Sequence, residues 1–188
     1  MILLIDNFDS FSHMLADLVR QAGVELKIVR NDTSLEEIQA IEFSALILSP
    51  GPGKPDQAGN LMQIFEEYYK KVPVLGVCLG HQAIGEFFGA KLVKNEIPIH
   101  GKVHQVRKTA NHPFMEGMPE CFNVTRYHSL QLGEIPTTLK VLLETPKGEV
   151  MGLVHQDLPI LGIQYHPEAF LTEYGLKLIQ NWVKTFDA

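Results

Sequence analysis

The first half of the chain alternates short hydrophobic runs with amphipathic stretches. The run at residues 1–5 predicts a strand, and apolar positions between residues 11 and 19 recur at the three-to-four spacing of a helix. Further strands are predicted at residues 24–29, 44–49 and 72–78. Helices are predicted after a capping box formed by Ser34 and Glu37, and at residues 60–71 and 81–92. This alternation favours right-handed β-α-β crossovers and a buried parallel sheet.

Beyond about Ala90 the pattern changes to short β-rich runs separated by turns. The predicted antiparallel strands cover residues 101–107, 122–127, 139–144, 149–155 and 160–165. Residues 172–186 then present one apolar helical face that can cover the sheet. The prediction is an α/β protein with three layers, in which helices flank a mostly parallel central sheet and the C-terminal half adds antiparallel strands. No linker or repeat interrupts residues 1–188, which are predicted to form one domain.

Composition narrows the range of functions. The chain is 45% hydrophobic and 20% charged, as is usual for soluble globular proteins, and it is long enough to build a core without disulfides or structural metal. Its net charge is -6 and it has no lysine- or arginine-rich block, so we expect no nucleic-acid partner. No apolar run approaches the roughly 18 residues of a membrane helix, and the residues MILLIDNFDS carry no positively charged region, so we expect no leader segment. We therefore expect no membrane association and a cytoplasmic location.

Cys78 lies in the segment GVCLG, between a predicted strand and a predicted helix. The flanking Gly76 and Gly80 permit the sharp strand-to-helix turn of a nucleophile elbow, which projects the central side chain outward. A sulfur at this place also faces the N-terminus of a helix, whose free N–H groups favour the thiolate. These features favour a nucleophile over a buried thiol that merely packs. Cys121 has no such setting and is predicted to pack as a small hydrophobic residue.

A thiolate that attacks an acyl group needs an imidazole to move protons and a third group to orient the imidazole. Among the eight histidines, His166 follows an apolar strand and precedes Glu168 by two residues. In an extended backbone two such side chains share a face, and Pro167 restrains His166 toward that conformation. Alone, this pattern fits an incidental surface loop equally well. Together with the elbow, it makes His166 and Glu168 the candidate base and orienting carboxylate, because both motifs follow apolar strands.

The third predicted strand is followed by SPGPG at residues 49–53. This loop has neither the GK[ST] ending of a phosphate loop nor a dinucleotide-binding glycine pattern, so phosphate binding is not supported. Its rigid turn is either a plain connection or a means of presenting the Gly53 N–H, which with that of Leu79 would form an oxyanion hole. His100 and His104 are spaced like metal ligands on a helix, but their neighbours favour a strand. We expect no metal or cofactor.

Five motifs, taken in order along nearly the whole chain, resemble those of the class I (triad-type) glutamine amidotransferases. They are LLIDNFDSF, SPGPG, GVCLGHQ, RYHSL and QYHPE. The first and fourth are most similar to the small glutaminase subunits of anthranilate and aminodeoxychorismate synthases. The resemblance implies a flavodoxin-like fold, a glutamyl thioester formed from L-glutamine, and ammonia that passes to a larger, separate chorismate-binding synthase subunit.

Carried over by position, the resemblance implies that Cys78 is the nucleophile, that His166 is the general base and acid, and that Glu168 orients His166. The implied oxyanion-hole amides belong to Gly53 and Leu79. The positions that match the family's glutamine-binding residues are Gly51, Pro52, Gly53, Gln82, Ser129 and Leu130.

The chain departs from the family pattern at a few positions. Ala169 stands where a serine often follows the glutamate, and His13 and Met14 replace residues near what resembles a partner-facing edge. Three alternatives remain: an amidotransferase subunit for another acceptor, a regulatory subunit with a vestigial triad, and a free-standing cysteine peptidase or hydrolase. The hypothesis of a chorismate-using partner is compatible with the synthesis of either tryptophan or folate precursors.

Overall fold

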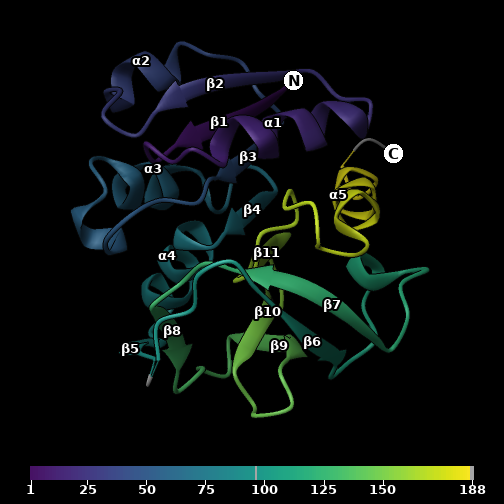
Figure 1. Ribbon diagram of the computed structural model, residues 1–188. Helices are drawn as coiled ribbons and strands as arrows, with labels where there is room; N and C mark the ends of the chain where they lie inside the picture. The colour runs from purple at the N-terminus through teal and green to yellow at the C-terminus, as the bar shows by residue number, and fades with distance from the viewer. Residues whose placement is uncertain (96, 187–188) are drawn as a thin grey trace.

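The computed structural model describes residues 1–95 and 97–186. A nine-stranded sheet has the order β2-β1-β3-β4-β11-β10-β9-β6-β7, and a small second sheet pairs β5 with β8 (Figure 1). The strands are β1 Ile2–Asp6, β2 Leu26–Arg30, β3 Ala45–Leu48, β4 Val74–Val77, β5 Lys91–Lys94, β6 Lys102–Lys108, β7 Cys121–Arg126, β8 Leu130–Gly133, β9 Leu139–Glu144, β10 Val150–His155 and β11 Ile160–Ile163. The α-helices are α1 Ser12–Gln21, α2 Leu35–Gln39, α3 Leu61–Tyr68, α4 Leu79–Phe87 and α5 Gly175–Val183.

Strand direction divides the large sheet into two parts. In the strand order, each neighbouring pair from β2 to β11 is parallel. Each neighbouring pair from β11 to β7 is antiparallel, so β11 is the strand at which the direction of pairing changes. This arrangement confirms the predicted parallel sheet and its antiparallel extension in the C-terminal half. The organisation of residues 1–188 as one domain stays a prediction.

The residues of β1 show how the sheet lies between two layers. Ile2 and Leu4 pack with residues of α1 and α5, whereas Leu3 and Ile5 pack with residues of α2, α3 and α4. Successive side chains of a strand point to opposite faces, so a strand buried on both faces is hydrophobic throughout. Figure 1 shows α1 and α5 side by side, with α3 and α4 in the other helical layer. The predicted three-layer arrangement is confirmed.

The hydrophobic pattern does not predict the small sheet of β5 and β8. The predicted helix at residues 81–92 is wrong at both ends, because α4 begins at Leu79, ends at Phe87 and is followed by the strand β5. Gly89 has a φ of +99°, a conformation that commonly terminates helices and that glycine adopts without strain. The last helix, α5, is also shorter than the predicted range 172–186. Within the described ranges, none of the helices has the length and hydrophobicity needed to span a bilayer.

Strand register decides which residues meet at the candidate site. Ile163 of β11 lies opposite Val77 of β4 in a parallel pair. The next residues along the two strands are Gln164 and Cys78, so their side chains emerge next to each other at the carboxyl edge of the sheet. Open α/β sheets place their functional sites at this edge.

Candidate active site

Cys78 occupies a strained turn between β4 and α4. Its φ of 53° and ψ of -99° fall in a region that residues other than glycine rarely adopt. The Cys78 N–H donates to the carbonyl of Ile163 at 2.8 Å, and the Cys78 carbonyl accepts from the N–H of Gln82 at 3.1 Å. The structure thus contains the sharp turn expected of GVCLG, fixed on one side to β11 and on the other to its own helix.

Gly76 and Gly80 let the first turn of α4 pack directly onto the sheet. A Cβ atom at Gly80 would lie 2.2 Å from the carbonyl oxygen of Leu48 in β3, and one at Gly76 would lie 2.5 Å from the carbonyl carbon of Gly80. Both contacts involve backbone atoms, which cannot rotate away as a flexible side chain can. The close approach that holds the turn therefore requires glycine at both positions.

We expect Gly80→Ala to lower the free energy of unfolding by up to about 3 kcal/mol, because its methyl group would force α4 away from β3. Gly133→Ala is a matched control, since its Cβ would meet no atom closer than 3.7 Å. Urea unfolding of the two variants measures the difference. Equal stability of the two variants would show that α4 does not depend on this close approach.

His166 and Glu168 are in direct contact. The His166 Nδ1 atom lies 2.6 Å from the Glu168 Oε1 atom, and both side chains are buried. His166 itself is extended, as predicted, and forms a β-bridge with Thr125. The predicted continuation of the extended backbone to Glu168 is wrong, because the chain turns at 167–168 and the Ala169 N–H donates to the carbonyl of His166. Proline at the second position of a tight turn is favoured by its fixed φ, so Pro167 promotes the turn that brings the two side chains together.

The surroundings of His166 favour the charged form of its imidazole. Burial disfavours the charged ring, but the side chains of Cys78 and Glu168 outweigh burial and raise the pKa of His166 to about 10. Because Nδ1 is engaged by Glu168, Nε2 is the nitrogen left for Cys78. The rings of Phe11 and Tyr127 pack against the imidazole, with centroids 4.8 and 5.1 Å away. The imidazole is thus held on several sides.

Gln164 is a buried residue of this site that the sequence reasoning missed. Its Nε2 donates to the Sγ of Cys78 at 3.7 Å, and its Oε1 accepts from the Nε2 of Gln82 at 3.1 Å. Gln82 also donates to the carbonyl of Leu130 at 3.0 Å. Gln164 belongs to the motif QYHPE, but only the strand order places it beside Cys78.

The SPGPG loop lies against the elbow. Gly51 packs so closely that a Cβ would come within 2.5 Å of Leu79 and of Asn7, and Gly53 has a φ of +76°. Asn7 anchors the loop through two hydrogen bonds to Ser49, each 2.9 Å long. The structure therefore brings the loop to the elbow residue Leu79. The oxyanion-hole role of its backbone stays a prediction.

The other predicted glutamine-binding positions differ in exposure, since Gln82 is buried and Leu130 is half-buried. Pro52 is exposed, as is Ser129, which directly precedes Leu130 and the strand β8. Gln82 contacts Leu130 through the hydrogen bond described above. Because both N–H donors of Gln82 are engaged within the protein, its amide oxygen is the atom left for a ligand.

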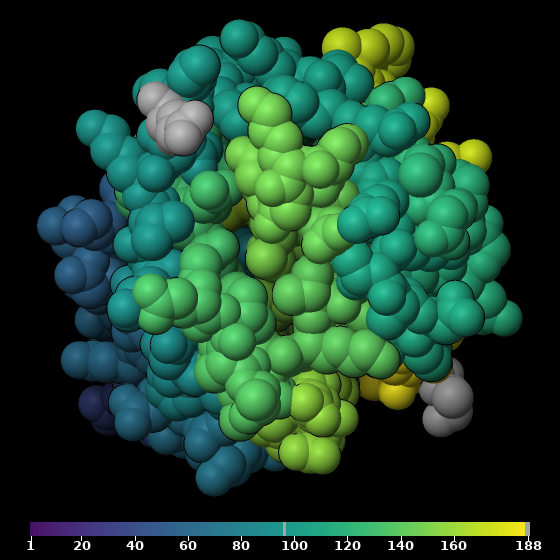
Figure 2. Space-filling model, turned by 90° about the horizontal axis from the view of Figure 1, so that it is seen from below, coloured from purple at the N-terminus to yellow at the C-terminus, as the bar shows by residue number. Residues whose placement is uncertain are grey.

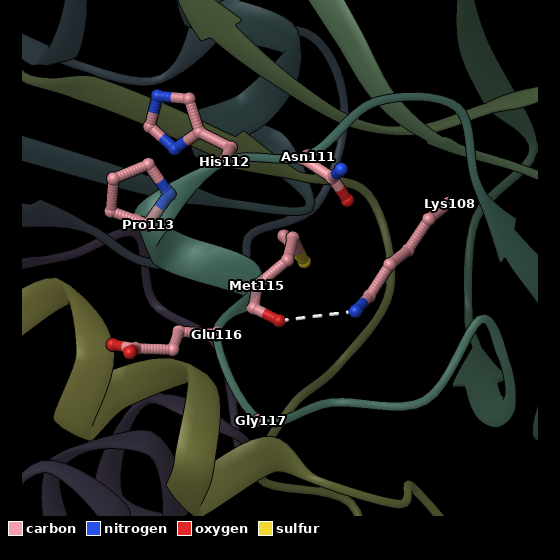
Figure 3. A pocket seen from close by; sticks show the side chains of 7 residues that line it. All are labelled: Lys108, Asn111, His112, Pro113, Met115, Glu116 and Gly117. Atoms are coloured by element: carbon pink, nitrogen blue, oxygen red, sulfur yellow. Dashed lines mark hydrogen bonds between the residues drawn. The ribbon is translucent and has the colours of Figure 1, made fainter.

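Two surface hollows lie away from Cys78, His166 and Glu168. One of about 550 Å³ is lined by residues 108–117, where the Nζ of Lys108 donates to the carbonyl of Met115 at 3.1 Å (Figure 3). The other, of about 650 Å³, lies between residues 94, 95 and 97–99 and the turn from β9 to β10, on the side of the molecule seen in Figure 2. In the described part of the chain, no three His, Cys, Asp or Glu side chains gather to hold a metal ion.

Comparison with known proteins places the chain in a family. Residues 3–186 match the family described as glutamine amidotransferase class-I. The chain belongs to the class I glutamine amidotransferases. Among its relatives in this family, anthranilate synthase component 2 of Azospirillum brasilense is 42% identical over 98% of this chain and 96% of that protein. Aminodeoxychorismate/anthranilate synthase component 2 of Bacillus subtilis is 39% identical over 99% of this chain and 97% of that protein.

The fold of this class I glutamine amidotransferase also matches solved structures. A putative GMP synthase subunit from Thermoplasma acidophilum superposes with a TM-score of 0.88 at 27% identity, over 99% of this chain and 93% of that one. Together with the family match, this similarity confirms the resemblance seen in the five sequence motifs and the predicted α/β architecture.

Proposed function

We propose that this protein is a glutaminase subunit that releases ammonia from the side-chain amide of L-glutamine and delivers it to a separate chorismate-aminating synthase subunit. The observation that carries the proposal is the buried His166–Glu168 pair next to a cysteine held in a strained elbow. This combination supplies a nucleophile, a proton carrier and an orienting carboxylate at one edge of the sheet.

In the first step, the Cys78 thiolate attacks the carbon of the glutamine side-chain amide. The carbonyl oxygen gains negative charge, which the N–H groups of Gly53 and Leu79 would stabilise. Such donors contribute about 3 to 4 kcal/mol each to the transition state. A thiolate at Cys78 and an imidazolium at His166 stabilise each other, since Cys78 and Glu168 together raise the pKa of His166.

In the second step, His166 gives its proton to the amide nitrogen and the carbon–nitrogen bond breaks. Ammonia leaves, and the glutamyl group remains as a thioester on Cys78. A water molecule then attacks the thioester carbon while His166 takes its proton, and the carbon–sulfur bond breaks to release glutamate. Glu168 holds the Nδ1 side of the ring throughout, so Nε2 is presented to the reacting atoms.

With alanine at position 169, the Glu168 carboxylate lacks a hydrogen bond that a serine there could donate. The Oε2 atom of Glu168 has no hydrogen-bond partner within the described residues, and an alanine cannot supply the hydroxyl that a serine at 169 would offer. The orienting role therefore depends on the single contact between Glu168 Oε1 and His166.

The relatives support a chorismate-using partner. The proteins from Azospirillum brasilense and Bacillus subtilis are both named as component 2 of such synthases, at 42% and 39% identity. The bifunctional protein TrpGD of Thermotoga maritima is 37% identical over 99% of this chain, which spans 32% of that protein. The putative GMP synthase subunit is less similar, at 27% identity, so another amino acceptor is the weaker alternative.

Reconstitution tests the proposal. The chain is co-purified with the synthase subunit it binds, and the pair is supplied with chorismate and glutamine. We expect the formation of an aromatic amine, and its identity assigns the protein to the anthranilate reaction, the aminodeoxychorismate reaction or both. Hydrolysis of peptides by the chain alone, without amination of chorismate by the pair, would contradict the proposal and favour a free-standing hydrolase.

Covalent labelling separates an active glutaminase from a regulatory subunit. A glutamine-analogue electrophile is expected to label Cys78 in the assembled complex, and mass spectrometry of the digested protein locates the adduct. An unreactive Cys78 thiol in that complex would favour a scaffold with a vestigial triad.

A further inference from the structure

The two amides next to Cys78 have a fixed orientation. The carbonyl of Leu130 can only accept, so the Gln82 atom that faces it at 3.0 Å is the nitrogen Nε2. That same nitrogen lies 3.1 Å from Gln164, which must therefore present its oxygen to Gln82. The remaining end of the Gln164 amide is its nitrogen, and it lies 3.7 Å from the Cys78 sulfur. Gln164 can only be a donor to Cys78.

The buried side chain of Arg126, paired with the half-buried Glu149, fixes the other end of this chain of hydrogen bonds. The Nε of Arg126 donates to the Nε2 of His128 at 3.0 Å, so the proton of the neutral ring is on Nδ1, which lies 2.8 Å from the carbonyl of Leu130. Burial is the main cause that lowers the pKa of His128 to about 4, and the ring is therefore neutral at pH 7. The guanidinium of Arg126 is held in turn by two hydrogen bonds to Glu149.

We propose that Gln164 is a further catalytic residue, whose amide N–H stabilises and aims the Cys78 thiolate, and that Gln82 is the positioning residue that holds this amide. This inference rests on the proposed role of Cys78 as nucleophile. Gln164 donates the hydrogen bond that the sulfur accepts, and the Nε2 of His166, which has no hydrogen-bond partner within the described residues, is available as a second donor. The sulfur is also directed by its own backbone turn.

The chemistry favours such a donor at this place. A thiolate on a residue that is only 6% exposed has few water molecules to solvate it, and an N–H in contact replaces part of that solvation. The donor is neutral, so it does not compete with His166 for the role of proton carrier. Gln164 is fully buried and cannot rotate into solvent, so its amide costs little reorganisation when the thiolate forms or is consumed.

The test is the pH dependence of alkylation of Cys78 by iodoacetamide in a Cys121→Ser background, since Cys121 is an exposed thiol. Gln164→Met keeps the side-chain length but removes the donor. We expect the inflection of the rate–pH profile to move up by about one unit, the size of one charge-assisted hydrogen bond. Gln164→Glu still accepts from Gln82 but puts a carboxylate beside the sulfur, and we expect a larger upward shift.

Two controls separate a chemical role from a structural one. Gln105→Met changes an exposed glutamine of β6 and should leave the inflection unchanged. Gln82→Met should give a smaller shift than Gln164→Met, and the double variant should shift no further than Gln164→Met alone. Additive shifts would contradict the relay through Gln82. An unchanged inflection in both Gln164 variants, with only a lowered unfolding midpoint, would overturn the role of Gln164.

The alkylation assay needs neither glutamine nor a partner, so the two proposals fail separately. A pH shift in the Gln164 variants without amination of chorismate by the pair would contradict the proposed function and support the amide donor. Normal amination by the wild-type pair with an unchanged inflection in both variants would contradict the amide donor alone.

Discussion

Cys78→Ala is expected to abolish amination of chorismate from glutamine while amination from added ammonia continues. Without the sulfur the proposed thioester cannot form, and the loss of the nucleophile lowers turnover by at least about 10⁴-fold in hydrolases with a Ser-His-Asp triad. Ammonia supplied in solution does not need the glutaminase step. The measurement is the rate of product formation by the reconstituted pair with each nitrogen source.

Cys121→Ala is the matched control for this variant. Cys121 lies on β7 and is exposed, so its loss removes a thiol without touching the elbow. We expect it to retain activity with both nitrogen sources. If Cys78→Ala removed both activities equally, the defect would lie in assembly with the synthase, and the proposed role of Cys78 as nucleophile would lose its main support.

The parallel half of the sheet could be predicted from the sequence because its strands are buried on both faces. Residues 2–5 are all buried, so their side chains must all be apolar, and the continuous run is visible without knowledge of the fold. The same holds for Ala45–Leu48. The helices between these strands have one polar face, which gives the contrasting period that marks each boundary.

The small sheet could not be predicted because little in it is buried. Lys91–Lys94 has two lysines around Leu92 and Val93, a pattern that also suits the end of an exposed helix. Its partner Leu130–Gly133 lies far away in the sequence, and pairing over such a distance leaves no local periodic signal. The decisive local feature is Gly89, which ends α4 before β5 begins.

Only those residues of the candidate site that have a local sequence signal could be predicted. Cys78, His166 and Glu168 each have a local signal, namely flanking glycines or a close carboxylate. Gln164 has none of its own, because its importance depends on the register that sets β11 beside β4. The contact between His166 and Glu168 was predicted, but through an extended backbone, whereas a turn at Pro167 forms it.

Arg126→Met is expected to lower the free energy of unfolding by about 1.5 to 3 kcal/mol, the contribution of hydrogen bonds to a charged group, because Glu149 is only half-buried. Arg126 is 1% exposed and donates to Glu149 at 2.8 and 3.0 Å. Methionine fills much of the space but leaves the Glu149 carboxylate with the hydroxyl of Thr145 alone. Arg107→Met is the matched control, since Arg107 is 60% exposed in its pair with Glu144 and should cost about 0.5 kcal/mol or less.

The dependence of this loss on pH identifies its cause. The hydrogen bonds from Arg126 are the main reason that the pKa of Glu149 falls from 4.5 to about 2. A carboxyl whose pKa is lower in the folded state stabilises the fold above its unfolded pKa, and the effect is lost as pH falls toward the folded value. Between pH 4.5 and 2 the wild-type protein should therefore lose stability more steeply than Arg126→Met or Glu149→Gln. Parallel slopes in urea titrations across this range would mean that the guanidinium stabilises the fold by packing and not by its charge.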